Sequence, residues 1–162
     1  MKHAGTTLHF ILLVMASTHT SLHYHLVFST KNCEAWFAPS TRDRLHEYLG
    51  GVIRTEGGFA HAIGGTGDHV HVLLGLSPTH SLAQVIQRIK SVSSRWIHDE
   101  WSWVGFAWQE GYGAFTVSAS SLEPVRAYVL HQEAHHRVKT FQEEYVEMLE
   151  RGMVEYDAKY LW

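Results

Sequence analysis

The sequence predicts an α+β fold, a ferredoxin-like split βαβ sandwich in which helices cover one face of an antiparallel sheet. The first observation is the element order of strand, helix, strand, strand, helix, strand, helix, which many RNA-recognition modules share. The second is composition: 162 residues, 45% of them apolar, suffice for one core, and a single cysteine excludes a disulfide framework. The third is the lack of repeats and low-complexity linkers, which favours one domain.

Hydrophobic periodicity indicates the first four elements. Residues 22–29 alternate and are rich in strand-forming side chains, so we expect a strand there. Residues 41–56 carry apolar side chains at helical spacing, and a glycine pair ends that helix. Two further strands are expected at 59–65 and 69–76, joined by the turn-forming Thr66-Gly67-Asp68.

The second half of the chain adds three helices and some short extended pieces. A helix is expected over 81–99, capped by its first serine and apolar along one face. Residues 106–108 and 115–118 are extended, either as one interrupted strand or as a hairpin. A third helix opens at 120–124, where a proline is tolerated in the first turn, and a fourth spans 140–151.

The N-terminus is expected to lie outside this fold. Lys2 and the apolar run from Leu8 to Ala16 have the outline of a short signal peptide, but the run is too short to span a bilayer. Met15 offers a second start of translation, so that the preceding residues are an extension. We therefore divide the chain into an extension over 1–21 and a single cytoplasmic domain over 22–162.

The charge balance excludes proteins that coat nucleic acid without specificity, because such proteins are usually basic. Thirteen Lys and Arg stand against 16 Asp and Glu, a net charge of −3. The acidic excess lies entirely in residues 133–162, so a local nucleic-acid site on the preceding part stays open. Fourteen histidines raise the question of a metal or phosphate site.

Two pairs of residues carry the chemistry. His69 and His71 are i and i+2 on a predicted strand, so both imidazoles point to one face and form half of a divalent-metal site. Tyr128 and Gln132 are four apart and lie one turn apart on a predicted helix. A Gln oxygen can bind a hard cation, and a phenol beside it can act as a nucleophile. Taken singly, each pair is better explained by ordinary packing or solvated residues.

Together these pairs and their surroundings resemble a known family, the single-tyrosine HUH transposases of small bacterial insertion sequences and their domesticated, palindrome-associated relatives. The resemblance covers essentially residues 22–162. The segments that carry it are His23 to Lys31, Gly67 to Leu73, Trp108 to Ser118, Tyr128 to His136, and Tyr156 to Trp162.

The resemblance implies an HUH endonuclease fold and a role for each of four residues. His69 and His71 match the metal-binding histidine pair, Gln132 the third ligand, and Tyr128 the nucleophile. The implied reaction is a metal-assisted cut of single-stranded DNA near hairpins, through a 5′-phosphotyrosine, with Mg²⁺ or Mn²⁺ and no nucleotide cofactor. Cys33 and Ala35 depart from the polar or basic residues that relatives more often carry in that loop.

Further residues have weaker signals. DNA contacts are assigned to four basic residues: Lys31, Arg88, Lys90 and Arg95. The alternative interpretation is that these charges only face solvent. His23 and His25 repeat the i, i+2 spacing but have no Tyr or Gln partner. His135 shares the Tyr128 stripe and is assigned a structural or phosphate-contacting role, and Asp68 a turn or outer-sphere role. Three tryptophans could stack on bases or pack in the core: Trp101, Trp103 and Trp108.

The predicted partners are hairpin-bearing single-stranded DNA and a second copy of the chain, with no membrane. Excision requires two cut ends, and one Tyr128 holds one, so a homodimer is expected. The resemblance implies that the tyrosine helix of one chain completes the histidine site of the other. Three other functions stay open: a domesticated nuclease acting on repetitive palindromes, a non-catalytic nucleic-acid-binding module, and a metal-dependent hydrolase that activates water.

Overall fold

The structure is a computed structural model that describes residues 18–162. The signal-like apolar run and the alternative start at Met15 lie outside the described residues. Residues 18–22 form no regular element and lead directly into the first strand. Along this described part, no helix combines the length and apolar character that crossing a membrane requires.

A four-stranded antiparallel sheet forms the centre of residues 18–162. The strands are β1 (His23–Ser29), β2 (Phe59–Gly65), β3 (His69–Gly75) and β4 (Gly113–Val117), in the spatial order β2-β3-β1-β4. This order confirms the ferredoxin-like prediction. The extended pieces after the second helix are not a hairpin, because β4 pairs with β1 while Trp108 only bridges to Thr30.

One face of the sheet carries the main hydrophobic core under two helices, α1 (Pro39–Thr55) and α2 (Leu82–Trp101). Alternate residues of β1 and β3 point into this core, as the strand period requires: Leu26, Phe28, Val70, Val72 and Leu74. The predicted tryptophans belong to it as well. Trp108 is buried, and its indole nitrogen donates a hydrogen bond to Ser93 Oγ at 3.0 Å. Trp101 and Trp103 pack half-buried against the same cluster.

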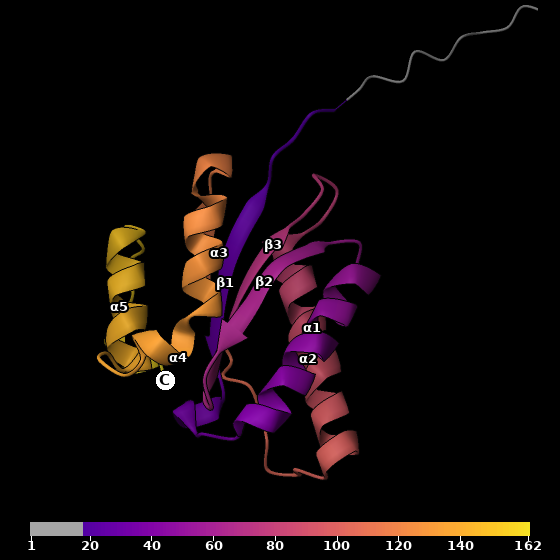
Figure 1. The fold of residues 1–162 in the computed structure, drawn as a ribbon, viewed down its shortest axis with the longest axis vertical. Helices are drawn as coiled ribbons and strands as arrows, with labels where there is room; N and C mark the ends of the chain where they lie inside the picture. The colour runs from indigo at the N-terminus through magenta and orange to yellow at the C-terminus, as the bar shows by residue number, and fades with distance from the viewer. Residues whose placement is uncertain (1–17) are drawn as a thin grey trace, which may run out of the picture.

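Helices cover the second face too, so the expectation of a one-faced sandwich is incomplete. Figure 1 shows α3 (Leu122–Leu130) and α5 (Phe141–Arg151) across the sheet from α1 and α2, with α4 (Gln132–His135) between them. The reason lies in the strands, where the residues facing this side are also fully buried: Val27, His69, His71 and Leu73. A sheet buried on both faces needs a cover on both.

The helix that starts after β4 is broken. It begins with a 3₁₀ turn (Ala119–Ser121), continues as α3, and ends at His131, whose φ of −106° and ψ of 26° are not helical. Tyr128 and Gln132 therefore lie on two helices. They still meet, because the Gln132 amide nitrogen donates to the Tyr128 carbonyl oxygen at 3.2 Å. The α5 helix begins as predicted, with Thr140 and Glu143 forming a capping box.

Candidate metal centre and active site

The centre of the site is the histidine pair on β3. The pleat points His69 and His71 toward α3 and α5, while Val70 between them lies in the core on the opposite face. Both imidazoles are completely buried, with ring centroids 5.1 Å apart. The i, i+2 spacing thus places the two rings together as predicted.

Hydrogen bonds to the outer nitrogen of each ring orient the pair. His69 Nδ1 lies 2.7 Å from Asp68 Oδ1 and 3.1 Å from Thr66 Oγ1, so this nitrogen carries the proton. His71 Nδ1 lies 2.9 Å from His25 Nε2. The Asp68 carboxylate fixes donation from His69 Nδ1, and when His71 Nδ1 donates to His25 in the same way, each ring keeps an Nε2 lone pair that can bind a metal. Asp68 is therefore in the outer-sphere position expected of it.

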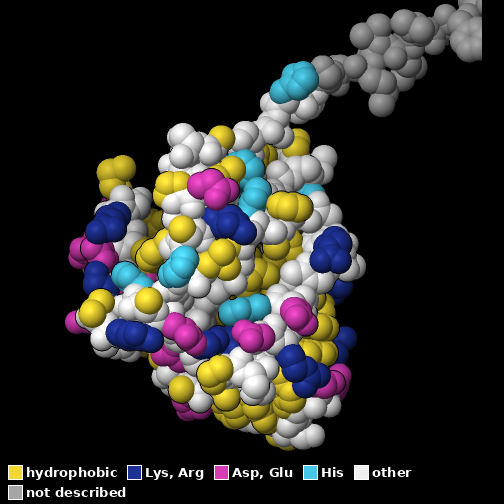
Figure 2. Space-filling view, viewed as in Figure 1, with side chains coloured by type: hydrophobic (Ala, Val, Ile, Leu, Met, Phe, Trp, Pro, Cys, Tyr) yellow, Lys and Arg dark blue, Asp and Glu magenta, His cyan; other side chains and the backbone are white. Residues whose placement is uncertain are grey.

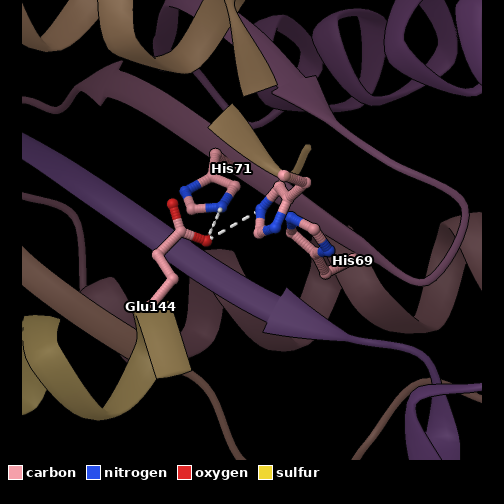
Figure 3. Close-up of side chains that lie close together, drawn as sticks. His69, His71 and Glu144 are labelled. Carbon is pink, nitrogen blue, oxygen red and sulfur yellow. Dashed lines mark ion pairs between the residues drawn. The ribbon is translucent and has the colours of Figure 1, made fainter. Parts of the chain in front are cut away.

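Two residues from the C-terminal region face this pair. The Glu144 carboxylate on α5 is 2% exposed, and its Oε2 lies 3.4 Å from His71 Nε2 and 3.0 Å from His136 Nε2. One ligand atom from each of His69, His71, His136 and Glu144 falls within 4.8 Å of the other three. Figure 3 shows Glu144 pointing from α5 toward the histidine pair on β3. The His136 ring follows the same pattern as the pair, because its Nδ1 donates to the Lys139 carbonyl oxygen at 2.8 Å.

Burial controls the charges of these groups. It lowers the pKa of His71 well below the ordinary value, helped by the neighbouring histidines, and lowers the pKa of His136 in the same way. The pKa of Glu144 is raised to about 8, first by burial and then by the nearby Glu147 and Asp68. Neutral imidazoles around a buried carboxyl are the state in which lone pairs are available to a cation.

The geometry fits a metal ion. Within residues 18–162, four buried polar atoms at this site have no hydrogen-bond partner: His69 Nε2, His71 Nε2, His135 Nε2 and Glu144 Oε2. Buried polar atoms are normally paired, so a cluster of unpaired ones requires an explanation. A divalent cation bound among the atoms of His69, His71 and Glu144 would satisfy these three together and offset the cost of burying the carboxylate.

Tyr128 reaches the site from α3 of the same chain. Its hydroxyl donates a hydrogen bond to Glu144 Oε1, and its ring centroid lies 5.8 Å from that of His71. Gln132 is 1% exposed, and its Oε1 lies 3.0 Å from His136 Nε2. One chain therefore brings together all four residues proposed from the sequence, the two histidines, the tyrosine and the glutamine.

Sequence reasoning missed Glu144 and did not assign His136 to the metal. A signal existed for Glu144, because it shares the buried face of α5 with Phe141, Tyr145 and Leu149. An acidic residue inside an apolar helical stripe is unusual enough to mark a paired or ligating group. His136 gave no comparable signal, since its place depends on the break at His131.

The rival histidine pair does not form a site of its own. The His23 ring turns to His61, with 3.1 Å between Nδ1 and Nε2, whereas His25 supports His71. His135 Nε2 lies 3.4 Å from Glu144 Oε1, at the edge of the site.

Three of the four basic residues assigned to DNA are on α2, across the sheet from the histidine pair. Arg88 pairs with Glu56 at 3.1 Å, and Arg95 is exposed. Lys90 donates to the carbonyl oxygens of three consecutive residues, 109–111, and so holds that loop. Lys31 is exposed just after β1. On the face that Figure 2 shows, Lys and Arg are interspersed with Asp and Glu rather than gathered in one patch.

Comparisons with known proteins match this chain to transposases. A family model described as "Transposase IS200 like" matches residues 18–132. The ISDra2 transposase TnpA of Deinococcus radiodurans is 25% identical over 114 residues, which cover 67% of this chain and 81% of that protein.

Two solved structures share the fold. A crystal structure of a protein described as a transposase from Deinococcus radiodurans R1 matches with a TM-score of 0.59 and 24% identity, covering 71% of this chain and 94% of that one. A REP-associated tyrosine transposase bound to a REP hairpin matches with a TM-score of 0.52 and 12% identity, covering 71% and 70%.

Proposed function

This chain belongs to the IS200-like transposase family, and on that premise we propose that it cuts and rejoins single-stranded DNA at hairpin-flanked sites through a covalent bond between Tyr128 and a 5′-phosphate. The observation that carries the proposal is the position of the Tyr128 hydroxyl beside Glu144 and the histidine pair. A phenol that served only for packing has no need of a buried polar site with unpaired nitrogens.

The residues of the chain would act as follows. The Tyr128 oxygen attacks the phosphorus of a phosphodiester, a new P–O bond forms, and the bond to the 3′-oxygen breaks, so that this oxygen leaves as a 3′-hydroxyl after taking a proton. His69 and His71, with Gln132 beside them, hold a divalent cation whose chemistry is to neutralise the anionic phosphate oxygens. The phosphotyrosine conserves the energy of the broken bond, so a 3′-hydroxyl from another strand can reverse the step.

The substrate is proposed to be single-stranded DNA with hairpins. The fold neighbour bound to a REP hairpin supports such a substrate. A domesticated nuclease acting on repetitive palindromes would use the same residues. Palindromes at both ends of the gene would favour a mobile element, whereas palindromes scattered across the genome would favour the domesticated nuclease. A non-catalytic module is disfavoured because histidines, not base-stacking aromatics, face this side of β3.

The test is a denaturing gel after incubation with labelled single-stranded hairpin DNA and Mg²⁺ or Mn²⁺. Wild type is expected to form a protein–DNA adduct through the 5′-phosphate, and Tyr128→Phe none, while hairpin binding stays nearly unchanged because only the nucleophilic oxygen is lost. Chelation by EDTA should abolish the adduct. An adduct that persists in Tyr128→Phe would overturn the proposal, and product without adduct would indicate a hydrolase.

Two cut ends require two tyrosines, so we propose that a homodimer carries out excision. The described chain holds Tyr128 in its own site, whereas the arrangement expected from the family shares sites between chains. Mixing a His69→Ala/His71→Ala chain with a Tyr128→Phe chain distinguishes the two. Once chain exchange is confirmed, restored cleavage shows shared sites, and continued inactivity shows sites built within one chain.

A further inference from the structure

We propose that Glu144 is itself a metal ligand, so that the site is a carboxylate and imidazole centre that prefers a transition metal to Mg²⁺, with the same carboxylate holding the nucleophile. The metal part stands on the geometry alone, and the role toward Tyr128 rests on the proposed function. Glu144 is on α5, beyond the residues 18–132 that the family model matches.

The Glu144 carboxylate has no ordinary partner. Within the described chain its polar neighbours are one tyrosine hydroxyl and three imidazoles, and no Lys or Arg pairs with it. A carboxylate that is 2% exposed and lacks a cation is costly, and proteins resolve that cost by protonating the group, by pairing the charge or by coordinating a metal. Glu147, one turn further along α5, shows the contrast, because it is more exposed and pairs with Lys139 and Arg151.

Several hydrogen-bond acceptor atoms lie close together around Glu144, without donors between them. His136 gives its Nδ1 proton to Lys139, so its Nε2 is an acceptor, yet this atom lies 3.0 Å from Glu144 Oε2 and 3.0 Å from Gln132 Oε1. His71 Nε2 lies 3.4 Å from the same carboxylate oxygen. Acceptors at these distances repel one another unless a proton or a cation lies among them. One proton bridges only one pair of these atoms, whereas a metal ion would be stabilised by His69, His71, His136 and Glu144 together.

The side chains that would bind the ion are held in place. The Phe141 ring stacks on His69 at a centroid distance of 4.3 Å, and Phe141 and Tyr145 anchor α5 against Val27 of β1. Asp68, His25 and the Lys139 carbonyl each fix one imidazole. Such outer contacts are typical of built metal sites. Because Oε1 accepts the Tyr128 hydroxyl while Oε2 faces the imidazoles, one carboxylate links nucleophile and metal.

The donor set determines the metal. Mg²⁺ prefers oxygen ligands and retains its water, whereas imidazole nitrogens suit transition metals such as Zn²⁺. Along the transition series, affinity for such a site rises from Mn²⁺, which also accepts carboxylate oxygens, to Co²⁺. Three imidazoles and one carboxylate therefore favour the transition metals. The expectation of Mg²⁺ as an equal alternative to Mn²⁺ is replaced by a preference for Mn²⁺, with Gln132 as a neighbour of His136 at the edge of the centre.

The experiment is metal binding by chelator-treated protein without DNA, measured by calorimetry with Mn²⁺ and Mg²⁺ and by the visible absorption of bound Co²⁺. The variant is Glu144→Gln, which keeps the shape of the side chain. Loss of an outer-sphere partner typically lowers metal affinity by roughly 10- to 100-fold. Because Glu144 is proposed as a direct ligand, we expect the Mn²⁺ affinity of Glu144→Gln to fall by at least that much and its Co²⁺ absorption spectrum to change. Glu150→Gln, an exposed position on the same helix, is the matched control and should match wild type.

Each outcome is decisive. Wild-type Mn²⁺ affinity in Glu144→Gln, with binding lost in His69→Ala, overturns the ligand assignment and leaves the family's histidine site intact. Equal affinity of wild type for Mg²⁺ and Mn²⁺ overturns the metal preference, and this measurement needs no variant if Glu144→Gln fails to fold. An absent DNA adduct in wild type would refute the proposed function without affecting any of these binding results.

Discussion

Adding one methyl group at Gly64 should displace the helix that carries the nucleophile. Gly64 is on β2 beside His71, and the backbone of α3 crosses directly over it. A Cβ at this position would lie 2.8 Å from the Val129 carbonyl carbon and closer still to its oxygen. Both atoms belong to backbone, so no side-chain rotation can relieve the contact.

The size of the displacement follows from that distance. Carbon atoms in contact are about 3.5–4.0 Å apart, so the carbonyl carbon alone requires α3 to retreat by at least about 1 Å, and the still closer oxygen requires more. Tyr128 directly precedes Val129 and moves with it, away from Glu144 and His71. A misplacement of about 1 Å can cost about 100-fold in rate. Overpacking should also cost about 1–3 kcal/mol in the free energy of unfolding.

The assay compares Gly64→Ala with Gly51→Ala. Gly51 is inside α1, and a Cβ there meets nothing within 4 Å, so alanine should stabilise the protein by about 0.5–1 kcal/mol and leave cleavage unchanged. Gly64→Ala should form the DNA adduct about 100-fold more slowly at saturating DNA while still folding. Adduct formation at the wild-type rate in Gly64→Ala would refute the idea that close approach of α3 to β2 positions Tyr128.

Two further predictions concern pH and the loop held by Lys90. Burial lowers the pKa of His25 and His46 to about 4, so between about pH 6.5 and 4 the unfolded chain binds these protons and the native chain does not. Stability of metal-free protein should therefore fall as pH falls through that window, by up to about 1.4 kcal/mol per pH unit for each histidine, and His46→Gln should flatten the slope measured by urea unfolding. An unchanged slope would contradict this. Lys90→Met should lower stability by about 1–3 kcal/mol, because three carbonyls lose their donor, without changing the salt dependence of DNA binding. A weaker salt dependence would restore Lys90 as a phosphate contact.

The family membership and the central pair were within reach of the sequence. Strand and helix periodicity are properties of short windows, so the β1, β2 and β3 strands and the α1, α2 and α5 helices were predicted within a few residues. The alternation of a strand also made it certain that His69 and His71 would share a face while Val70 entered the core. These relations depend only on residues that are near one another in the chain.

Relations between distant segments were decided by tertiary packing. The break at His131 separates two residues expected on one helix, and it places His136 where a straight helix would not. The cover on the second face arises because β1 and β3 are buried on both sides, which periodicity in one strand does not reveal. α3 can approach β2 so closely only because position 64 has no side chain.

The carboxylate at the centre shows the same division. By itself the sequence determined that Glu144 is an acidic residue on the apolar stripe of a capped helix. Only the tertiary structure decided that this stripe packs against β1 and next to the imidazoles, so that the carboxylate meets His71, His136 and Tyr128. Whether a side chain can bind a metal depends on distances of a few ångströms between separate helices and strands, and local periodicity does not encode such distances.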